Sequence, residues 1–245
     1  MRSNMLKDRS CISGSFDTNG DVCSADVDII DMSSDNWSSK KWESKGVEVF
    51  KGVVDGFKLL AEQVKQIKGF RVRYYNLDYV FKDENSWKDI SEELNNQGFN
   101  KPKQYHVVYD GSILPRKIGS FHLAPTDDGT MWHQSDSIGI SGVSLSTTRA
   151  SLATSYVRGF HQLMHNYINS SVATEYATTD NGYDAIHQLG TGTKNGRTLM
   201  ADTHPHRAIR GECSQPIIRC VKSPNNIHFS DCTINAVKRS IQRNQ

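Results

Sequence analysis

Two histidines separated by three residues carry the clearest chemical signal in this chain. They are His161 and His165, in the run His161-Gln162-Leu163-Met164-His165. On an α-helix, residues four apart project from the same face about one turn from each other. The H-E-x-x-H motif uses this spacing to bring two imidazoles to one zinc ion. The spacing therefore predicts two ligands of a zinc site.

The residue after the first histidine departs from that motif. The motif has Glu at this position, because a carboxylate must take a proton from the attacking water. This chain has Gln162 instead, an amide of the same shape that cannot act as a base. We therefore expect a zinc peptidase that is nearly inactive as written. The sequence does not tell whether this Gln is natural or introduced.

Length and composition indicate a polar globular protein. The chain has 245 residues, which suits one large domain or two small ones and allows a sizeable core, and 23% of them are charged. A net charge of +2 gives no reason to expect nucleic acid or an acidic membrane as a partner. No apolar run has the length of a transmembrane helix. The run Met1-Arg-Ser-Asn-Met-Leu-Lys is too short and polar for a signal peptide, and resembles the start of a mature secreted domain with an added Met.

The five cysteines gather near the two ends of the chain, at Cys11, Cys23, Cys213, Cys220 and Cys232. None has the C-x-x-C spacing of a thiolate zinc site. Clustering of this kind favours disulfide bonds in a secreted protein. Short loops rich in turn residues predict the pairs Cys11–Cys23 and Cys220–Cys232, because closing a short loop costs little entropy. The odd number leaves one thiol over.

Hydrophobic periodicity predicts an α+β fold. Residues 1–48, rich in Ser, Asp, Asn and Gly, are expected to form an irregular N-terminal arm, and residues 49–245 a single domain. The predicted elements are, in chain order, a helix at 53–67, a strand at 70–81, a short helix at 87–94, strands at 105–109, 119–124 and 138–145, a long helix with an apolar stripe from Leu152 to Tyr167, and helices at 185–189 and 234–241.

A catalytic zinc ion needs a third protein ligand, which must come from a later segment. The run Ala177-Thr-Thr-Asp180-Asn-Gly-Tyr183-Asp184 matches the pattern G-T-x-D-x-x-Y-G at its Thr, Asp and Tyr. The run Met200-Ala-Asp202-Thr, followed by Ala208, is similar to a second stretch of the same proteins. Residues 145–210 thus resemble the aspzincin zinc metallopeptidases, which comprise the deuterolysins and the fungal lysine-specific metallo-endopeptidases.

This resemblance implies a zincin-like fold with a small twisted sheet, a long active-site helix and a mostly helical C-terminal part. It implies that zinc is held by His161, His165 and Asp180. It gives Tyr183 the role of stabilising the oxyanion, and Asp202 that of lining a pocket for a basic side chain after the cleaved bond. Gln162 then occupies the position of the general base.

The chain also departs from the aspzincin pattern. Both glycines of the motif are absent, and the gap between His165 and Asp180 is longer than in the family. His187, in a run with helical character, is a rival third ligand. Met200 would suit a metzincin, but that class needs a third His six residues after the second, where Ser171 stands.

The function that the sequence favours is a secreted zinc-dependent endopeptidase acting on a peptide or protein substrate. One alternative is a natural pseudoprotease or effector that binds a host protein instead of cutting it. Another is an ADP-ribosyltransferase-like toxin, since residues 142–148 resemble the Ser-Thr-Ser strand of those enzymes. Arg116 and Glu212 would then be catalytic, but Asp110 and Arg210 stand where Arg and an acidic residue or Gln are usual.

Overall fold

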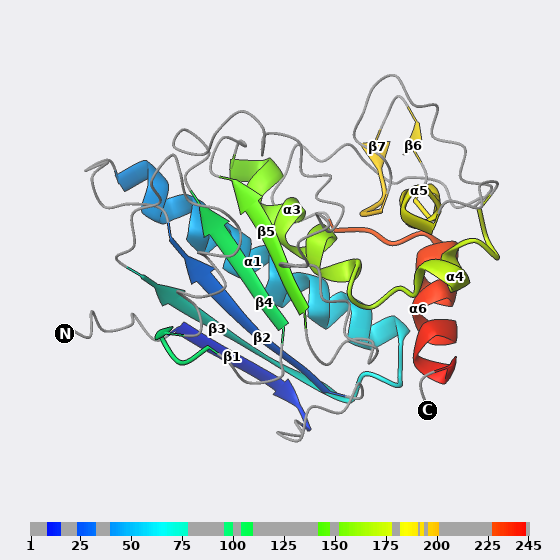
Figure 1. Ribbon diagram of the computed structural model, residues 1–245, viewed down its shortest axis with the longest axis horizontal. Coiled ribbons are helices and arrows are strands. Elements are labelled where there is room, and N and C mark those ends of the chain that lie inside the picture. Colours follow the sequence, from blue (N-terminus) through cyan, green and yellow to red (C-terminus); the bar gives the residue numbers. More distant parts are fainter. Residues whose placement is uncertain are drawn as a thin grey trace.

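The computed structural model describes residues 9–15, 24–32, 40–77, 96–99, 104–109, 142–147, 152–177, 182–190, 192–193, 196–200 and 227–243. Five strands form one sheet, and two long helices cover one of its faces (Figure 1). A smaller group of helices and a two-stranded ribbon lies beyond one end of the sheet. The fold is α+β, as the order of predicted elements indicated.

The sheet is mixed, with four parallel strands and one antiparallel strand at its edge. Its strands are β1 (Arg9–Gly14), β2 (Ser24–Asp31), β3 (Gly69–Asn76), β4 (Gln104–Tyr109) and β5 (Gly142–Thr147). They lie side by side in the order β1-β3-β2-β4-β5. Only β1 is antiparallel to its neighbour, β3.

The prediction of an irregular N-terminal arm is wrong for the residues of β1 and β2, and β2 is the central strand of the sheet. Strand β2 was not predicted because Ser24–Asp31 contains three aspartates, and Asp is depleted in strands. Asp26 and Asp28 lie on the face away from the helices and pair with arginines of β3. The helix that follows also begins within the expected arm, at Lys40.

These ion pairs join the central strand β2 to its neighbour β3. Arg73 contacts Asp28 at 2.6 Å and Asp26 at 2.6 Å, and Arg71 contacts Asp26 at 2.7 Å. Burial by itself would lower the pKa of Arg73, but its pairing with Asp28 and Asp26 outweighs this and raises the pKa above its ordinary value. Because Asp28 is fully buried, the pairing with Arg73 offsets the cost of removing its charge from water.

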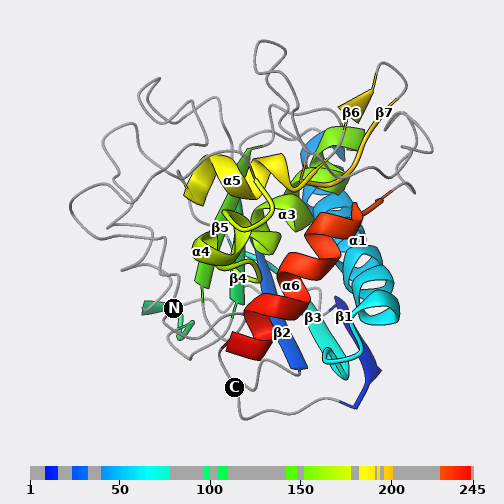
Figure 2. The same ribbon diagram turned by 90° about the vertical axis from the view of Figure 1, so that its right-hand side faces the viewer.

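Helix α1 (Lys40–Gln63) connects β2 to β3 and buries its apolar stripe against the sheet. The prediction of a helix with apolar residues from Val53 to Ile67 is confirmed as far as Gln63, and Val64 and Ile67 are buried just beyond its end. Helix α3 (Leu152–Met164) follows β5 and packs against α1. Figure 2 shows α3 between α1 and the C-terminal helices.

Two glycines of α1 allow the close approach of α3. A Cβ atom at Gly52 would lie 1.7 Å from the backbone oxygen of Tyr156, and one at Gly56 would lie 2.2 Å from the Phe160 ring. Real Cβ contacts are far longer, so a side chain at either position would push the helices apart. The hydroxyl of Tyr156 also donates to Asp55 of α1 at 2.7 Å, and burial together with this bond raises the Tyr156 pKa.

We expect Gly52→Ala to lower the free energy of unfolding by about 2–3 kcal/mol, the upper part of the usual range for overpacking. The clash is with backbone, which cannot rotate away, and it outweighs the gain in helix propensity of about 1 kcal/mol. Urea unfolding followed by circular dichroism measures the change. Lys51→Ala, at an exposed neighbouring position, is the control and should change stability by less than about 0.5 kcal/mol. A Gly52→Ala protein as stable as the control would contradict the close helix approach.

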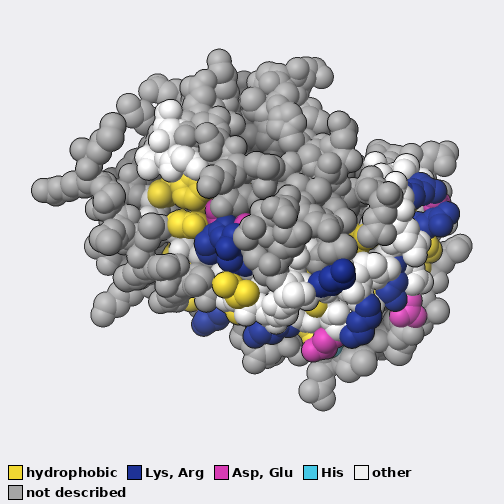
Figure 3. Space-filling view, turned by 90° about the horizontal axis from the view of Figure 1, so that it is seen from below, with side chains coloured by type: hydrophobic (Ala, Val, Ile, Leu, Met, Phe, Trp, Pro, Cys, Tyr) yellow, Lys and Arg dark blue, Asp and Glu magenta, His cyan; other side chains and the backbone are white. Residues whose placement is uncertain are grey.

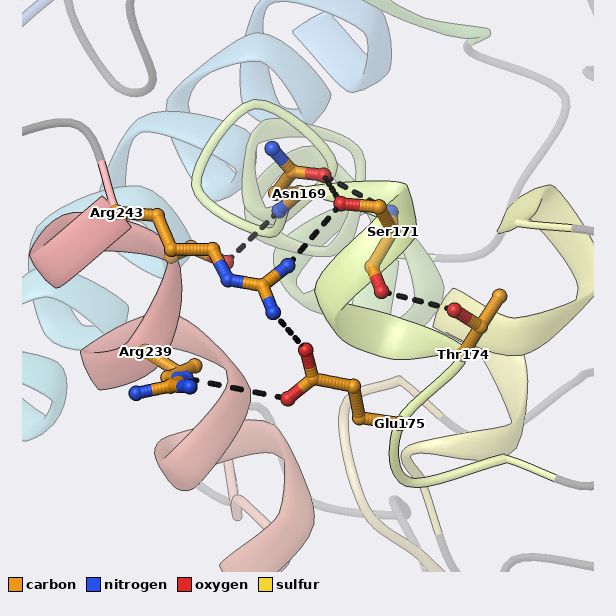
Figure 4. Close-up of polar contacts among 7 residues, drawn as sticks. Asn169, Ser171, Thr174, Glu175, Arg239 and Arg243 are labelled. Carbon is orange, nitrogen blue, oxygen red and sulfur yellow. Dashed lines mark hydrogen bonds and ion pairs between the residues drawn. The ribbon is translucent and has the colours of Figure 1, made fainter.

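The C-terminal part contains α4 (Ser170–Ala173), α5 (Gly182–Gln188), the ribbon of β6 (Gly192–Thr193) and β7 (Gly196–Arg197), and α6 (Asp231–Arg243). The predicted helices at 185–189 and 234–241 correspond to α5 and α6. Glu175, which follows α4, joins α6 through Arg243 and, at 3.9 Å, through Arg239 (Figure 4). These ion pairs are largely exposed, so each contributes little stability.

Two of the expected strands are found in part, and other elements lie outside the described residues. The strand predicted at 70–81 is present as Gly69–Asn76, and that at 138–145 as Gly142–Thr147. The strand at 105–109 is confirmed as Gln104–Tyr109. The helix at 87–94 and the strand at 119–124 fall outside the part of the chain that the structure describes.

The structure contradicts one of the two predicted disulfide bonds. Cys11 is a free thiol, so the predicted pair Cys11–Cys23 is wrong. Cys11 lies opposite Val72 in the β1–β3 register and packs against the hydrophobic core. Cys232 is disulfide-bonded, and its partner lies outside the described residues. The predicted pair Cys220–Cys232 therefore stays a prediction.

The described surface gives no sign of a membrane-spanning element. Among the residues described, no helix combines the length and the apolar character needed to cross a bilayer. Seen from below, Lys and Arg side chains are spread over the face as separate groups, with Asp and Glu side chains among them (Figure 3).

Candidate metal centre

Three histidines from two helical segments come together beside the C-terminal end of α3. They are His161, His165 and His187, and their candidate ligand atoms all lie within 4.8 Å of one another. The ring centroids are 5.2 Å apart for His161 and His165, 5.3 Å for His161 and His187, and 4.8 Å for His165 and His187. His165 is buried, and the other two are half-buried.

The end of α3 differs from the sequence-based prediction. The helix was expected to continue to Tyr167, but it ends at Met164, so that His161 lies in its last turn and His165 in the turn that follows. There the backbone N–H of His165 donates to Gln162 at 3.3 Å, three residues back instead of four. This tighter winding is common at the ends of helices. The two histidines still point to a common site.

The third histidine comes from α5. His187 lies in the last turn of this short helix, 22 positions after His165 in the sequence. Ala185, Ile186 and Leu189 are buried around it in the core. Burial of these apolar side chains fixes α5 against the body of the domain and leaves His187 half-buried beside the other two histidines.

A backbone carbonyl orients the His161 ring. The Nδ1 atom of His161 lies 2.7 Å from the oxygen of Leu199. A carbonyl oxygen can only accept, so Nδ1 carries the hydrogen, and the lone pair of the neutral ring is on Nε2. A hydrogen bond of this kind typically fixes the tautomer and orientation of a metal-binding histidine. His161 is thus prepared to bind a metal through Nε2.

The donor set fits a transition metal. Two nitrogens on one tetrahedral zinc ion lie about 3.4 Å apart, since each Zn–N bond is about 2.0–2.1 Å. The observed limit of 4.8 Å requires ring movements of about 1 Å, which small side-chain rotations provide. Imidazole suits zinc, copper, iron and nickel, so the ligands by themselves do not select among these metals.

A buried amide pair anchors the chain directly after His165. The Asn166 Nδ2 atom donates to Oε1 of Gln104 at 2.6 Å, joining the end of α3 to strand β4. Both side chains are buried, and so is Tyr167, whose pKa burial raises above its ordinary value. Tyr167 packs edge-on against Phe57 with ring centroids 5.6 Å apart. The turn that carries His165 is therefore fixed both to strand β4 and to helix α1.

The structure unites some of the predicted site residues and leaves others undescribed. His161 and His165 lie together as predicted, and Gln162, which follows His161 in the sequence, is buried with 7% of its surface exposed. Tyr183 belongs to α5, one helical turn before His187. Asp180 and Asp202 lie outside the described residues, so their assignment as a zinc ligand and as a pocket residue stays a prediction.

His187 is the candidate ligand that the sequence favoured least. Its only sequence signal was a histidine within a helix-like run, which gives no spacing relation to the H-x-x-x-H pair. The Asp-x-x-Tyr match directed attention to Asp180 instead. The role of Leu199 could not be predicted from its residue type, because it contacts His161 through its backbone oxygen.

No model of a known protein family matches the sequence, and no curated protein is significantly similar to it.

Proposed function

We propose that this chain is a zinc-binding domain of the endopeptidase type, with the zinc held by His161, His165 and His187. The proposal rests on the cluster of three histidines whose ligand atoms lie within 4.8 Å of one another. Three protein ligands and one open position are the usual arrangement of a catalytic zinc site. Helix α3, with His161 in its last turn and His165 in the turn that follows, and the sheet beneath it support a zincin-like fold.

A bound zinc ion would polarise a peptide carbonyl and lower the pKa of a water molecule. The residues of this chain supply the rest of the site. His161 is orientated by the Leu199 carbonyl, and His165 by the anchored turn. Gln162 stands where a base would take a proton from the attacking water, and its amide cannot accept one. We therefore expect very low turnover from the chain as written.

The third ligand distinguishes this proposal from the aspzincin pattern. That pattern assigns the role to Asp180, whereas the described geometry favours His187. In this scheme Tyr183, one turn earlier in α5, retains the proposed role of stabilising the oxyanion. Asp202 retains the proposed role of selecting a basic side chain in the substrate.

Secretion is part of the proposal. The disulfide bond at Cys232 supports it, because such bonds form and persist in oxidising compartments. The substrate would then be a peptide or protein outside the cell.

A second candidate is a binding module that keeps the metal site and has lost catalysis. The observation that favours it is Gln162 itself, a buried amide at the sequence position where the motif has its base. Such a pseudoprotease would bind a protein, including a host protein, without cutting it. The ADP-ribosyltransferase alternative depends on Arg116 and Glu212, which lie outside the described residues, and NAD binding would test it.

The direct test of the metal proposal is the zinc content of the purified protein. After treatment with a chelator and dialysis, calorimetric titration with Zn²⁺ should show one site per chain. Mg²⁺, which prefers oxygen ligands, is the matched control and should give no heat of binding. A chain that takes up no zinc by either measurement would overturn the proposal.

A further inference from the structure

The segment Ile227–Thr233, which leads into α6, contacts the backbone beside two of the three candidate ligands. Its first contact is on the His161 side. The backbone N–H of Leu199 donates to the oxygen of His228 at 2.8 Å, and the oxygen of Leu199 accepts the Nδ1 hydrogen of His161 at 2.7 Å. The carbonyl that orients His161 is therefore held in place by the segment before α6.

The second contact is on the His187 side. Leu189 lies two residues after His187, and its backbone oxygen accepts hydrogen bonds from the hydroxyls of Ser230 and, at 3.2 Å, Thr233. Carbonyls at the C-terminal end of a helix have no partner within that helix. The two hydroxyls supply the missing donors at the end of α5.

Ser230 also caps α6. Its Oγ atom accepts the backbone N–H of Thr233 at 3.1 Å, three residues further on, which is the hydrogen bond of a helix N-cap. Ser230 and Thr233 are fully buried. One hydroxyl thus joins the start of α6 to the end of α5, and Figures 1 and 2 both show these two helix ends as neighbours.

The segment is itself fixed from both sides. Cys232, between the two hydroxyl-bearing residues, is disulfide-bonded. Ile227, the first residue of the segment, and Ile234, which follows its last residue, are buried in the hydrophobic core. A segment held in this way can restrain the helix ends it contacts.

We propose that Ser230 is a positioning residue of the metal site and that the segment Ile227–Thr233 sets the separation of His161 from His187. This inference rests on the proposed metal-binding function. Ser230 acts through the Leu189 carbonyl on the end of α5, while His228 acts through Leu199 on the His161 ring. The segment therefore aligns ligands that come from two different helices, α3 and α5.

The test is zinc affinity measured by competition with a chromophoric chelator. Residues behind the ligands of a metal typically contribute 10–100-fold to its affinity, so Ser230→Ala should raise the Kd for Zn²⁺ by about that factor. The Co²⁺-loaded protein should also show an altered visible spectrum, because the ligand geometry changes. A purely structural role for Ser230 would leave that spectrum unchanged.

Ser240→Ala is the matched control. Ser240 is an equally buried serine within α6, and its Oγ accepts the N–H of Asn169, the N-cap of α4, at 2.9 Å. It should lower the melting temperature without changing the Kd or the Co²⁺ spectrum. If Ser230→Ala does not fold, Thr233→Val removes one of the two hydroxyls on the Leu189 carbonyl at constant shape and should raise the Kd by several-fold.

The outcomes separate the two proposals. A wild-type chain that binds no zinc overturns the metal site itself. A wild-type chain that binds zinc, together with Ser230→Ala and Thr233→Val proteins of unchanged Kd and Co²⁺ spectrum, overturns the positioning role alone.

Discussion

Replacing His165 with Ala is expected to abolish stoichiometric zinc binding. His165 is the buried member of the cluster and is 5.2 Å and 4.8 Å from the other two rings, measured between centroids. Losing a direct ligand should cost more than the roughly 100-fold that outer residues contribute. Zinc present at 100 times its Kd stabilises a protein by about 2.7 kcal/mol. The variant should therefore lose a zinc-dependent rise in melting temperature of about 5–10 °C.

His228→Ala is the control for this experiment, since His228 is a half-buried histidine whose bond to the Leu199 N–H is made by its backbone oxygen, which alanine also has. It should keep one zinc per chain and the melting shift. Parallel His187→Ala and Asp180→Ala proteins identify the third ligand. Loss of zinc in His187→Ala alone would support the three-histidine site. Loss of zinc in Asp180→Ala alone would support the aspzincin arrangement. A His165→Ala protein that retains one tightly bound zinc would contradict both.

Restoring the base through Gln162→Glu is expected to create endopeptidase activity. A carboxylate at this position can take a proton from the attacking water and deliver it to the leaving amine, which an amide cannot do. General acid–base catalysis typically contributes about 10²–10⁴-fold. Because Gln162 is 7% exposed, the Glu replacing it would be largely shielded from water, which favours a raised pKa and an effective base. Cleavage of a mixed peptide library by the zinc-loaded protein, analysed by mass spectrometry, measures the gain.

The double variant Gln162→Glu, His165→Ala is the control, since it has the base but lacks a metal ligand, and it should be inactive. In the active protein, Tyr183→Phe should lower turnover by roughly 10²–10³-fold with little change in KM, the scale seen when one oxyanion donor is removed. The proposed role of Asp202 predicts cleavage before Lys or Arg. If zinc is bound and no peptide is cut, the proposed peptidase is wrong, and the binding module becomes the better interpretation.

The amino-acid sequence by itself determined the elements whose apolar residues repeat at helical spacing. The stripe through Val53, Phe57 and Leu60 predicted α1, and Phe160 and Leu163 predicted the buried face of α3; all five side chains are buried. The pair His161 and His165 was equally predictable, because a spacing of four residues in a helical segment places two side chains on the same face. Local periodicity is sufficient for such features, since their geometry depends on a few consecutive residues.

Features that depend on distant partners were decided only by the tertiary structure. The aspartates of β2 made that strand look like an irregular arm, until Arg71 and Arg73 on the neighbouring strand paired with them. Charged residues can occupy a central strand when their partners lie across the sheet, and those partners are about 45 residues away in sequence. Cys11 is likewise free because the sheet directs it into the core.

The same reason explains the third candidate ligand. His187 joins the pair only because the fold brings α5 beside the end of α3. Ser230, 43 residues after His187, donates to the Leu189 carbonyl just beyond α5. Leu199 contributes a backbone oxygen, which every residue type possesses. No local pattern encodes such contacts, because they result from how the helices pack. The sequence thus placed His161 and His165 four positions apart, and only the arrangement of α3, α5 and α6 brought His187 close to them.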